Sequence, residues 1–386
     1  MASRHVVAAV CVSAVLVGVS AATASEADVP RRTGVVFTVF EELPPGGACP
    51  GVYAVDARTR EISWLGGWDA ARQDTAVYPA FTPSGTFTFG HFSTPNTTGL
   101  PLVDVYAAGR IAVERALSFA TWRWSPRRNE VAYVRIRSGG GELVVTSATG
   151  ATRVLVRYPA VGLWWLPDGS GLVYGPRAGS TEGITFVRRD GRVRKVLARS
   201  ASHPVVSPDG RRVAFLRARS RLDPGGLWVV GSRGGPARRV LGPAPYERLR
   251  PAVWLSNREL LVQHGGTGDT IFDVSDTLTR VDVDTRRERP FLKHAFALSL
   301  SPDRNRVLFV RPHRGGETYY SIRTVRTDGR GEQLLAVTDE EDLNIGSMPV
   351  WKPAAVQLDR VGELPPVPIT PEACVARLTA VRARTP

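Results

Sequence analysis

A tandem repeat runs through this sequence and restricts the folds open to it. Each copy has an apolar residue, a turn marked by Pro or Asn, and a short apolar run suited to a β-strand. Repeats of about 40 residues are typical of propellers and solenoids, in which each unit buries its apolar surface against its neighbours. The four clearest copies span residues 124–133, 165–174, 206–215 and 300–309, and weaker copies begin at Phe81 and Trp254.

Each repeat divides into four short stretches with the character of β-strands. The first ends at the apolar residue before the turn, and its inward-facing residues alternate with period two, as at Leu163 and Trp165. In the turn, Pro fixes φ at the second position, while Asp and Gly suit the third and fourth positions of a type I turn. Short strands at even spacing, separated by turn signals, predict an all-β fold, a β-propeller of four-stranded blades.

The two ends of the repeat region are each incomplete, and together they make one blade. Residues 35–40 have the pattern of a second strand with no first strand before it, and residues 51–55 and 61–65 supply the third and fourth. Residues 348–353 have the pattern of a first strand with no second strand after it. Pairing the two ends closes a ring and removes open sheet edges. Six whole repeats and one shared repeat predict seven blades; six or eight stay open, because three repeats are degenerate.

The best copy of the repeat, from Val206 to Phe215, joins Ser-Pro-Asp-Gly to Val-Ala-Phe. This signature resembles the TolB-like, or PD40, family of WD40-like β-propeller repeats, and the resemblance covers residues 34–353. It implies the fold but no single function, because such repeats occur in periplasmic binding scaffolds, in propellers attached to peptidases and in carbohydrate-active enzymes. The chain lacks the separate N-terminal domain of TolB, so a role in the Tol-Pal system is not implied. A Gly-x-Ser-x-Gly nucleophile elbow is also absent from the sequence.

Residues 1–24 have the pattern of a signal peptide. Arg4 and His5 give a positive start, residues 6–18 are almost wholly apolar, and the small residues at 22–24 suit cleavage. We therefore expect an exported protein, secreted or held in the cell envelope or periplasm. An uncleaved membrane anchor is the alternative. No later stretch approaches the roughly 18 apolar residues of a membrane span, so none is expected in the mature chain.

After the repeats, residues 354–386 hold a proline-rich linker and a short predicted helix. Thr370 suits the N-cap of this helix, and Pro371 suits its first position. Cys49 and Cys374 are the two cysteines of the mature chain, and export allows a disulfide between them. The linker is long enough to bring them together. Two unpaired thiols are the alternative.

The chain is strongly basic, with a formal net charge of +14. Such a charge points to anionic partners in general. However, the basic residues are nearly all arginines scattered through every repeat, which indicates a coding bias rather than a nucleic-acid site. A protein or an anionic cell-envelope polymer is the partner we expect for an exported chain, which we expect to be a monomer. The only lysines are Lys195, Lys293 and Lys352.

The sequence shows no recognisable catalytic, cofactor or metal-binding constellation. The histidines of the mature chain fall in different repeats and lack the spacing of a metal site. Propeller enzymes draw their catalytic carboxylates from different blades, so spacing does not reveal such a pair. Four tryptophans occupy the same place before the turn, which indicates packing between blades rather than sugar binding. They are Trp124, Trp165, Trp254 and Trp351.

The repeat is broken in three places, at residues 91–102, 264–276 and 339–342. Loops on a rigid scaffold are where function concentrates, so these segments are the candidate binding loops. We expect a non-catalytic propeller that binds a protein or a cell-envelope ligand. The alternative is a carbohydrate-active enzyme, a polysaccharide lyase or a glycoside hydrolase, with its site at a channel mouth. The candidate binding residues are His91, Asn96, His264, Asp269, Asp273, Asp276, Asp339, Glu340, Glu341 and Asp342.

Overall fold

A computed structural model gives the conformation of most of the repeat region, and every regular element in its described part is a β-strand. The described residues are 34–40, 51–57, 59–67, 76–92, 102–107, 110–117, 122–137, 140–147, 149–157, 162–175, 183–217, 225–242, 248–265, 277–313, 319–338, 344–345 and 350–351.

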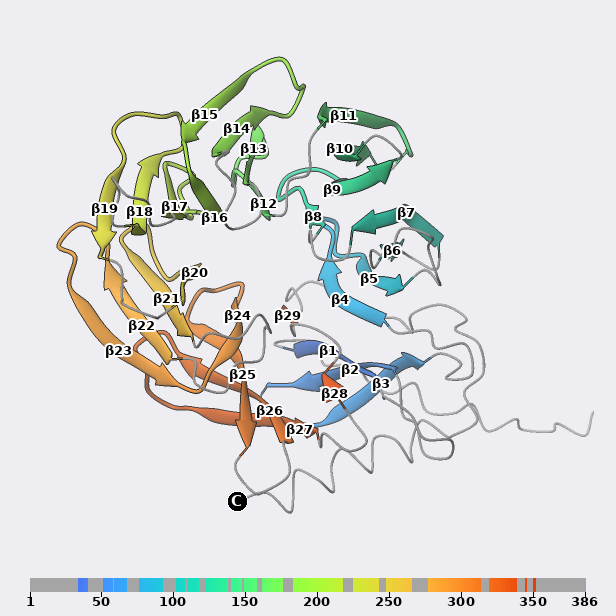
Figure 1. The fold of residues 1–386 in the computed structure, drawn as a ribbon. Coiled ribbons are helices and arrows are strands. Elements are labelled where there is room, and N and C mark those ends of the chain that lie inside the picture. Colours follow the sequence, from blue (N-terminus) through green and yellow to red (C-terminus); the bar gives the residue numbers. More distant parts are fainter. Residues whose placement is uncertain are drawn as a thin grey trace, which may run out of the picture.

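The strands form a closed ring of seven antiparallel blades, each with four strands (Figure 1). Blade 1 has β28 (Asn344–Ile345) and β29 (Val350–Trp351) as two pieces of its inner strand, followed by β1 (Gly34–Phe40), β2 (Gly51–Asp56) and β3 (Ile62–Gly67). Blade 2 is β4 (Ala76–Phe81), β5 (Phe87–Phe92), β6 (Leu102–Ala107) and β7 (Arg110–Leu117). Blade 3 is β8 (Arg123–Trp124), β9 (Glu130–Arg137), β10 (Gly140–Ser147) and β11 (Thr152–Val156).

The other four blades follow in chain order. Blade 4 is β12 (Gly162–Trp165), β13 (Gly171–Gly175), β14 (Ile184–Arg188) and β15 (Arg194–Ala198). Blade 5 is β16 (Ala201–Val206), β17 (Arg212–Arg217), β18 (Gly226–Gly231) and β19 (Arg238–Leu241). Blade 6 is β20 (Arg248–Trp254), β21 (Glu259–Gly265), β22 (Thr277–Asp282) and β23 (Glu288–Lys293). Blade 7 is β24 (Phe296–Leu300), β25 (Arg306–His313), β26 (Tyr319–Arg326) and β27 (Gln333–Thr338).

Blade 1 confirms the predicted closure of the ring by the two ends of the repeat region. Val35 of β1 pairs with Trp351 of β29, and Phe40 pairs with Asn344 of β28, both antiparallel. The inner strand therefore comes from the far end of the chain, but in two pieces rather than one. The count of seven blades and the all-β class are confirmed as well. Residues 1–24 and 354–386, with the predicted signal peptide and helix, lie outside the described residues, as do Cys49 and Cys374.

The apolar core lies between blades rather than inside one. Trp165 and Leu172 of blade 4 pack with Val134 and Leu143 of blade 3, and all four are buried. Similar clusters join blades 4 and 5, blades 5 and 6, blades 6 and 7, and blades 7 and 1. A blade that packs on both sides in this way has both faces buried only when it has a neighbour on each side.

Three of the tryptophans before the turns tie their own blade to the blade before it. The indole N–H of Trp165 donates to the backbone oxygen of Arg123 at 2.8 Å, and that of Trp254 donates to Val205 at 3.0 Å. Trp351 reaches the backbone oxygen of Ser299 at 3.4 Å. In all three the acceptor is the residue just before the pre-turn position of the preceding blade. This geometry confirms that the repeated tryptophans pack between blades.

Two substitutions of Trp165 distinguish what its hydrogen bond contributes to stability from what its packing contributes. We expect Trp165→Phe to lower the free energy of unfolding by about 1–2 kcal/mol, because the buried Arg123 carbonyl loses its donor. Trp165→Ala should cost about 3–5 kcal/mol, since it also leaves a cavity. Urea unfolding followed by circular dichroism measures both. Trp228→Phe is the control, because this half-buried indole bonds only to Gly225 of its own blade. A Trp165→Phe variant as stable as wild type would rule out a role for the bond.

Candidate functional site

The two faces of the ring are built differently. Strands alternate in direction within a blade, so the first-to-second and third-to-fourth links lie on one face, which we call the turn face. The second-to-third links and the links between blades leave from the opposite face, the loop face. All three breaks in the repeat join strand ends on the loop face: β5 to β6, β21 to β22, and β27 to β28. The topology therefore gathers the candidate binding loops on one side of the ring.

The structure describes two of the candidate binding residues. The backbone of His91 lies in β5 and pairs with Asp104 of β6. His264 is half-buried in β21 and pairs with Thr277 of β22. Both histidines therefore lie in second strands near the loop face, but in blades 2 and 6, which are not neighbours. The other candidates lie outside the described residues: Asn96, Asp269, Asp273, Asp276, Asp339, Glu340, Glu341 and Asp342.

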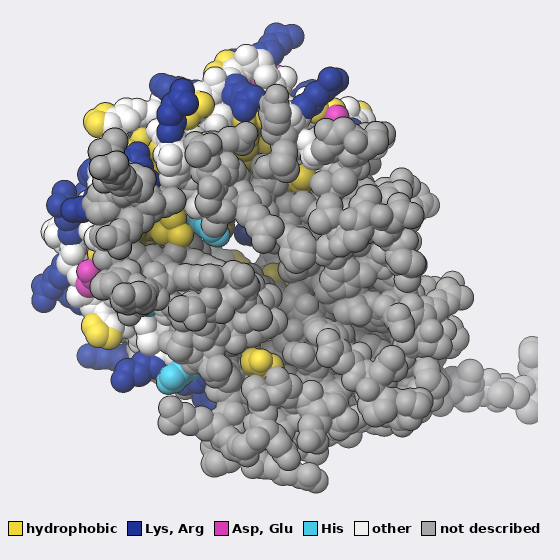
Figure 2. Space-filling view, in the orientation of Figure 1, with side chains coloured by type: hydrophobic (Ala, Val, Ile, Leu, Met, Phe, Trp, Pro, Cys, Tyr) yellow, Lys and Arg dark blue, Asp and Glu magenta, His cyan; other side chains and the backbone are white. Residues whose placement is uncertain are grey.

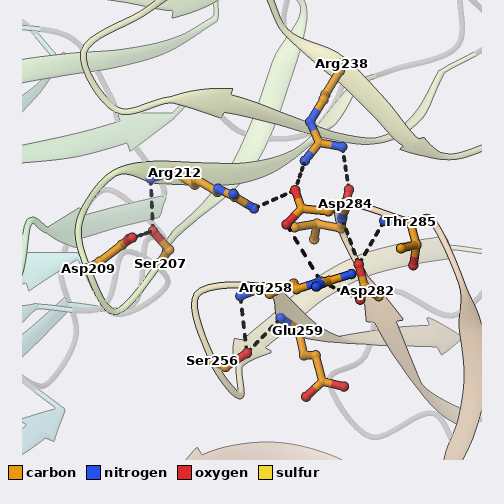
Figure 3. A network of polar contacts seen from close by, with 11 residues as sticks. Ser207, Asp209, Arg212, Arg238, Ser256, Arg258, Glu259, Asp282, Asp284 and Thr285 are labelled. Atoms are coloured by element: carbon orange, nitrogen blue, oxygen red, sulfur yellow. Dashed lines mark hydrogen bonds and ion pairs between the residues drawn. The ribbon is translucent and has the colours of Figure 1, made fainter.

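The turn face carries a dense network of charged side chains between blades 5 and 6 (Figure 3). The Asp284 carboxylate accepts from Arg212 at 2.9 Å and from Arg238 at 2.7 Å. Asp282 accepts from the backbone N–H groups of Asp284 and Thr285 and pairs with Arg258 at 2.7 Å. Since each of these charges has its partner inside the network, the cluster fastens two blades together and is not an open site.

A basic side chain fastens each of four successive blade pairs at the outer rim. Every one donates to a backbone oxygen in the third-to-fourth turn of the next blade. The scatter of arginines through every repeat indicates a coding bias and does not predict this role, although basic residues do begin several of the predicted fourth strands. The pairs are Arg153 with Arg189 at 3.2 Å, Lys195 with Arg233 at 2.6 Å, Arg238 with Val283, and Arg280 with Thr327.

The repeated Ser-Pro-Asp turns are closed by their own side chains. In blade 7 the Ser301 hydroxyl donates to Asp303 at 2.6 Å and accepts the backbone N–H of Arg306 at 2.9 Å. Arg304 takes the place of the usual glycine, with φ at +59°, and its side chain donates to the backbone oxygen of Trp254 at 2.6 Å. A non-glycine residue in this conformation is strained, and here its side chain gains a bond to the neighbouring blade.

The inner wall of the ring differs from both faces. Arg123, Trp164 and His203 lie on three successive inner strands, β8, β12 and β16. The guanidinium carbon of Arg123 lies 4.4 Å from the ring centroid of Trp164. Burial lowers the pKa of Arg123 to about 10, so the group is still charged at neutral pH. Space-filling atoms leave a hollow at the centre of the ring, and many Lys and Arg side chains lie along the coloured part of the outer edge of the molecule (Figure 2).

His203 is the most unusual residue of the inner wall. It is exposed, its φ is +52°, and it lies where the register of β16 shifts against β17. Its Nδ1 lies 3.0 Å from the Ser202 hydroxyl. Sequence analysis named none of the three inner-wall residues as candidates. The one signal present was that Arg123 is charged at a position where the other repeats are not.

The described residues offer no evident place for a metal ion, since no three His, Cys, Asp or Glu side chains among them are grouped closely enough to hold one. Within the same residues, no helix is long and apolar enough to cross a membrane.

No protein-family profile and no curated protein matches the sequence. Solved structures do match. Prolyl oligopeptidase B from Galerina marginata has a TM-score of 0.54 at 9% identity, covering 83% of this chain and 52% of its own. An oligogalacturonate lyase in complex with manganese has a TM-score of 0.50 at 14% identity, covering 78% and 85%. TolB from Acinetobacter baumannii has a TM-score of 0.46 at 15% identity, covering 82% of each chain.

The chain is a β-propeller. At these identities the likeness concerns the fold alone. The propeller's function has to be argued from its own residues.

The lowered pKa values of the turn carboxylates predict that the folded ring loses stability in acid. Hydrogen bonds from the Ser301 hydroxyl and the Asn305 N–H lower the pKa of Asp303, and the Ser170 N–H lowers that of Asp168. Their folded pKa values lie below the unfolded value of about 3.9. Their stabilising contribution is therefore complete above that value and is lost as pH falls through it towards the folded pKa.

We expect a melting temperature that is steady between about pH 5 and 7 and falls below about pH 4. The double variant Asp168→Asn/Asp303→Asn should show a shallower fall, because the amide oxygens still accept hydrogen bonds but no longer titrate. Differential scanning fluorimetry across pH measures both proteins. An unchanged acid limb in the double variant would show that other groups set the acid sensitivity.

Proposed function

We propose that the protein is an exported β-propeller that binds a partner protein on its loop face without catalysing a reaction. The observation that supports this is the placement of all three breaks in the repeat on that face. The turn face, by contrast, uses its polar groups to fasten blades and close turns. A rigid ring that fixes the strand ends from which several loops leave is a good binding scaffold, because each loop is anchored at both ends.

The charges of the three segments favour a protein as the partner. Together, residues 93–101, 266–276 and 339–343 contain seven acidic residues and no Lys or Arg, although the chain as a whole is basic. An acidic set of loops would repel an anionic envelope polymer and attract a basic protein surface. The same proposal includes export directed by residues 1–24 and a disulfide between Cys49 and Cys374. Binding would then occur outside the cytoplasm.

Neutralising the acidic loops tests this role. We expect a variant with Asp269, Asp273 and Asp276 changed to Asn, and residues 339–342 changed to their amides, to capture at least tenfold less of its partner from an envelope extract. Its melting temperature should match that of the wild type. The wild-type capture should weaken as salt rises, since the attraction is between exposed charges. Captured proteins are identified and quantified by mass spectrometry.

The matched control neutralises two exposed acids on the turn side, Glu288→Gln and Asp328→Asn. It should capture as much partner as the wild type. Repeated captures that return no protein, or equal capture by the loop variant, would count against the proposal.

His203 favours a second candidate, a carbohydrate-active enzyme at the inner wall. Residues in strained backbone conformations cluster at functional sites, and histidine is the side chain best suited to proton transfer near neutral pH. This candidate predicts turnover on a panel of acidic and neutral polysaccharides, and a loss of about 100-fold or more in His203→Ala. Product release is followed by reducing-end and ultraviolet assays. No turnover by the wild type on any polysaccharide would eliminate it.

A further inference from the structure

Arg123 has a charge that no described side chain neutralises. Among the described residues, its guanidinium contacts only the ring of Trp164, and its Nε is buried without a hydrogen-bond acceptor. Two other half-buried arginines, Arg135 and Arg311, have carboxylate partners: Arg135 meets Glu142 at 2.8 Å, and Arg311 meets Glu332 at 2.6 Å. Arg123 therefore stands apart from the arginines that fasten the ring.

The scaffold does not require a charged side chain at this position. Arg123 is the residue just before the pre-turn tryptophan, and what the ring uses there is its backbone oxygen, which accepts from Trp165. Any residue supplies that oxygen. The equivalent residues of the other six blades are uncharged: Ala80, Trp164, Val205, Val253, Ser299 and Val350.

Keeping a charge here costs stability. A guanidinium that is withdrawn from water without an anion nearby loses hydration and gains little in return, and the lowered pKa of Arg123 reflects that loss. The stacked indole recovers only part of it, since a cation–π contact is weaker than the hydration that a charged group loses on burial. A residue that breaks the pattern of its own repeat at a cost is most simply explained by a ligand.

We propose that Arg123 is an anion receptor on the inner wall and that it binds a planar carboxylate. The guanidinium lies over the ring of Trp164, and the N–H groups of a guanidinium point outward in its own plane, which is the edge that a ligand would meet. Two parallel hydrogen bonds to a carboxylate fit that edge, whereas a single point charge does not use it. The residue is only partly exposed, so the ligand enters a partly dehydrated site in which the ion pair is stronger than at the surface.

This inference goes beyond the proposed binding role on the loop face, because it concerns a separate surface. The loop variant described above leaves Arg123 in place, and the variants below leave the acidic loops in place. The two proposals can therefore fail independently.

The test compares wild type with Arg123→Val, the residue found at three equivalent positions. Without ligand, we expect Arg123→Val to melt about 2–6 °C higher, because an unpaired charge has been removed from a partly buried site. Glucuronate, at matched ionic strength, should raise the melting temperature of the wild type by about 2 °C once it exceeds its Kd tenfold, and should leave Arg123→Val unchanged. Arg123→Gln, which keeps most of the side-chain length, should behave in the same way if the valine variant folds poorly.

Controls identify the chemistry and the source of the anion. Glucose tests the sugar without the carboxylate, and sulfate tests an anion that is not planar; neither should shift the wild type. Glucuronate and N-acetyl-aspartate amide separate a sugar acid from a peptide side chain as the source of the carboxylate. Arg238→Val removes an arginine that has partners, so it should melt lower than wild type yet keep the response. Lower stability of both Arg123→Val and Arg123→Gln, a response in these variants equal to that of the wild type, or an equal response of the wild type to sulfate would overturn the proposal.

Discussion

Every part of this molecule depends on closing the ring. Blades 4 to 7 each pack one face on the blade before and the other on the blade after, so an open row of blades would leave apolar surface exposed at its ends. The pairing of β1 with β28 and β29 solves this problem with residues from opposite ends of the repeat region. It also covers the edge of β1, which would otherwise offer free backbone groups to another chain.

Two sets of hydrogen bonds hold neighbouring blades at a fixed angle. Near the centre, indole N–H groups reach backbone oxygens of the preceding blade. At the outer rim, arginine and lysine side chains reach turn oxygens of the following blade. Arg123 takes part in the inner set through its backbone alone, which leaves its side chain free for another purpose. At Arg123 the scaffold therefore uses the backbone oxygen and does not use the charged side chain.

The turn face and the loop face differ in whether their polar groups are already paired within the ring. On the turn face, carboxylates and guanidiniums are matched to one another or to turn amides, as at Asp284 and Asp303. Matched groups stabilise the ring but have little left to offer a partner. The breaks in the repeat all open on the other side, where the strand ends at His91 and His264 lead into the candidate loops. Binding on that side is therefore compatible with a rigid ring.

The sequence alone determined the all-β class, the four strands of each repeat, the turn chemistry and the shared blade, because alternation and turn residues are local properties of the chain. It also marked Trp165 and its equivalents as packing residues, since they recur at one position. Only the tertiary structure decided that the closing strand is in two pieces, that arginines fasten the rim, and that Arg123 stacks on Trp164. The rim bonds and the stacking join residues about 40 positions apart, and the closing strand joins the two ends of the repeat region. Their geometry depends on the angle between blades, which no local pattern records.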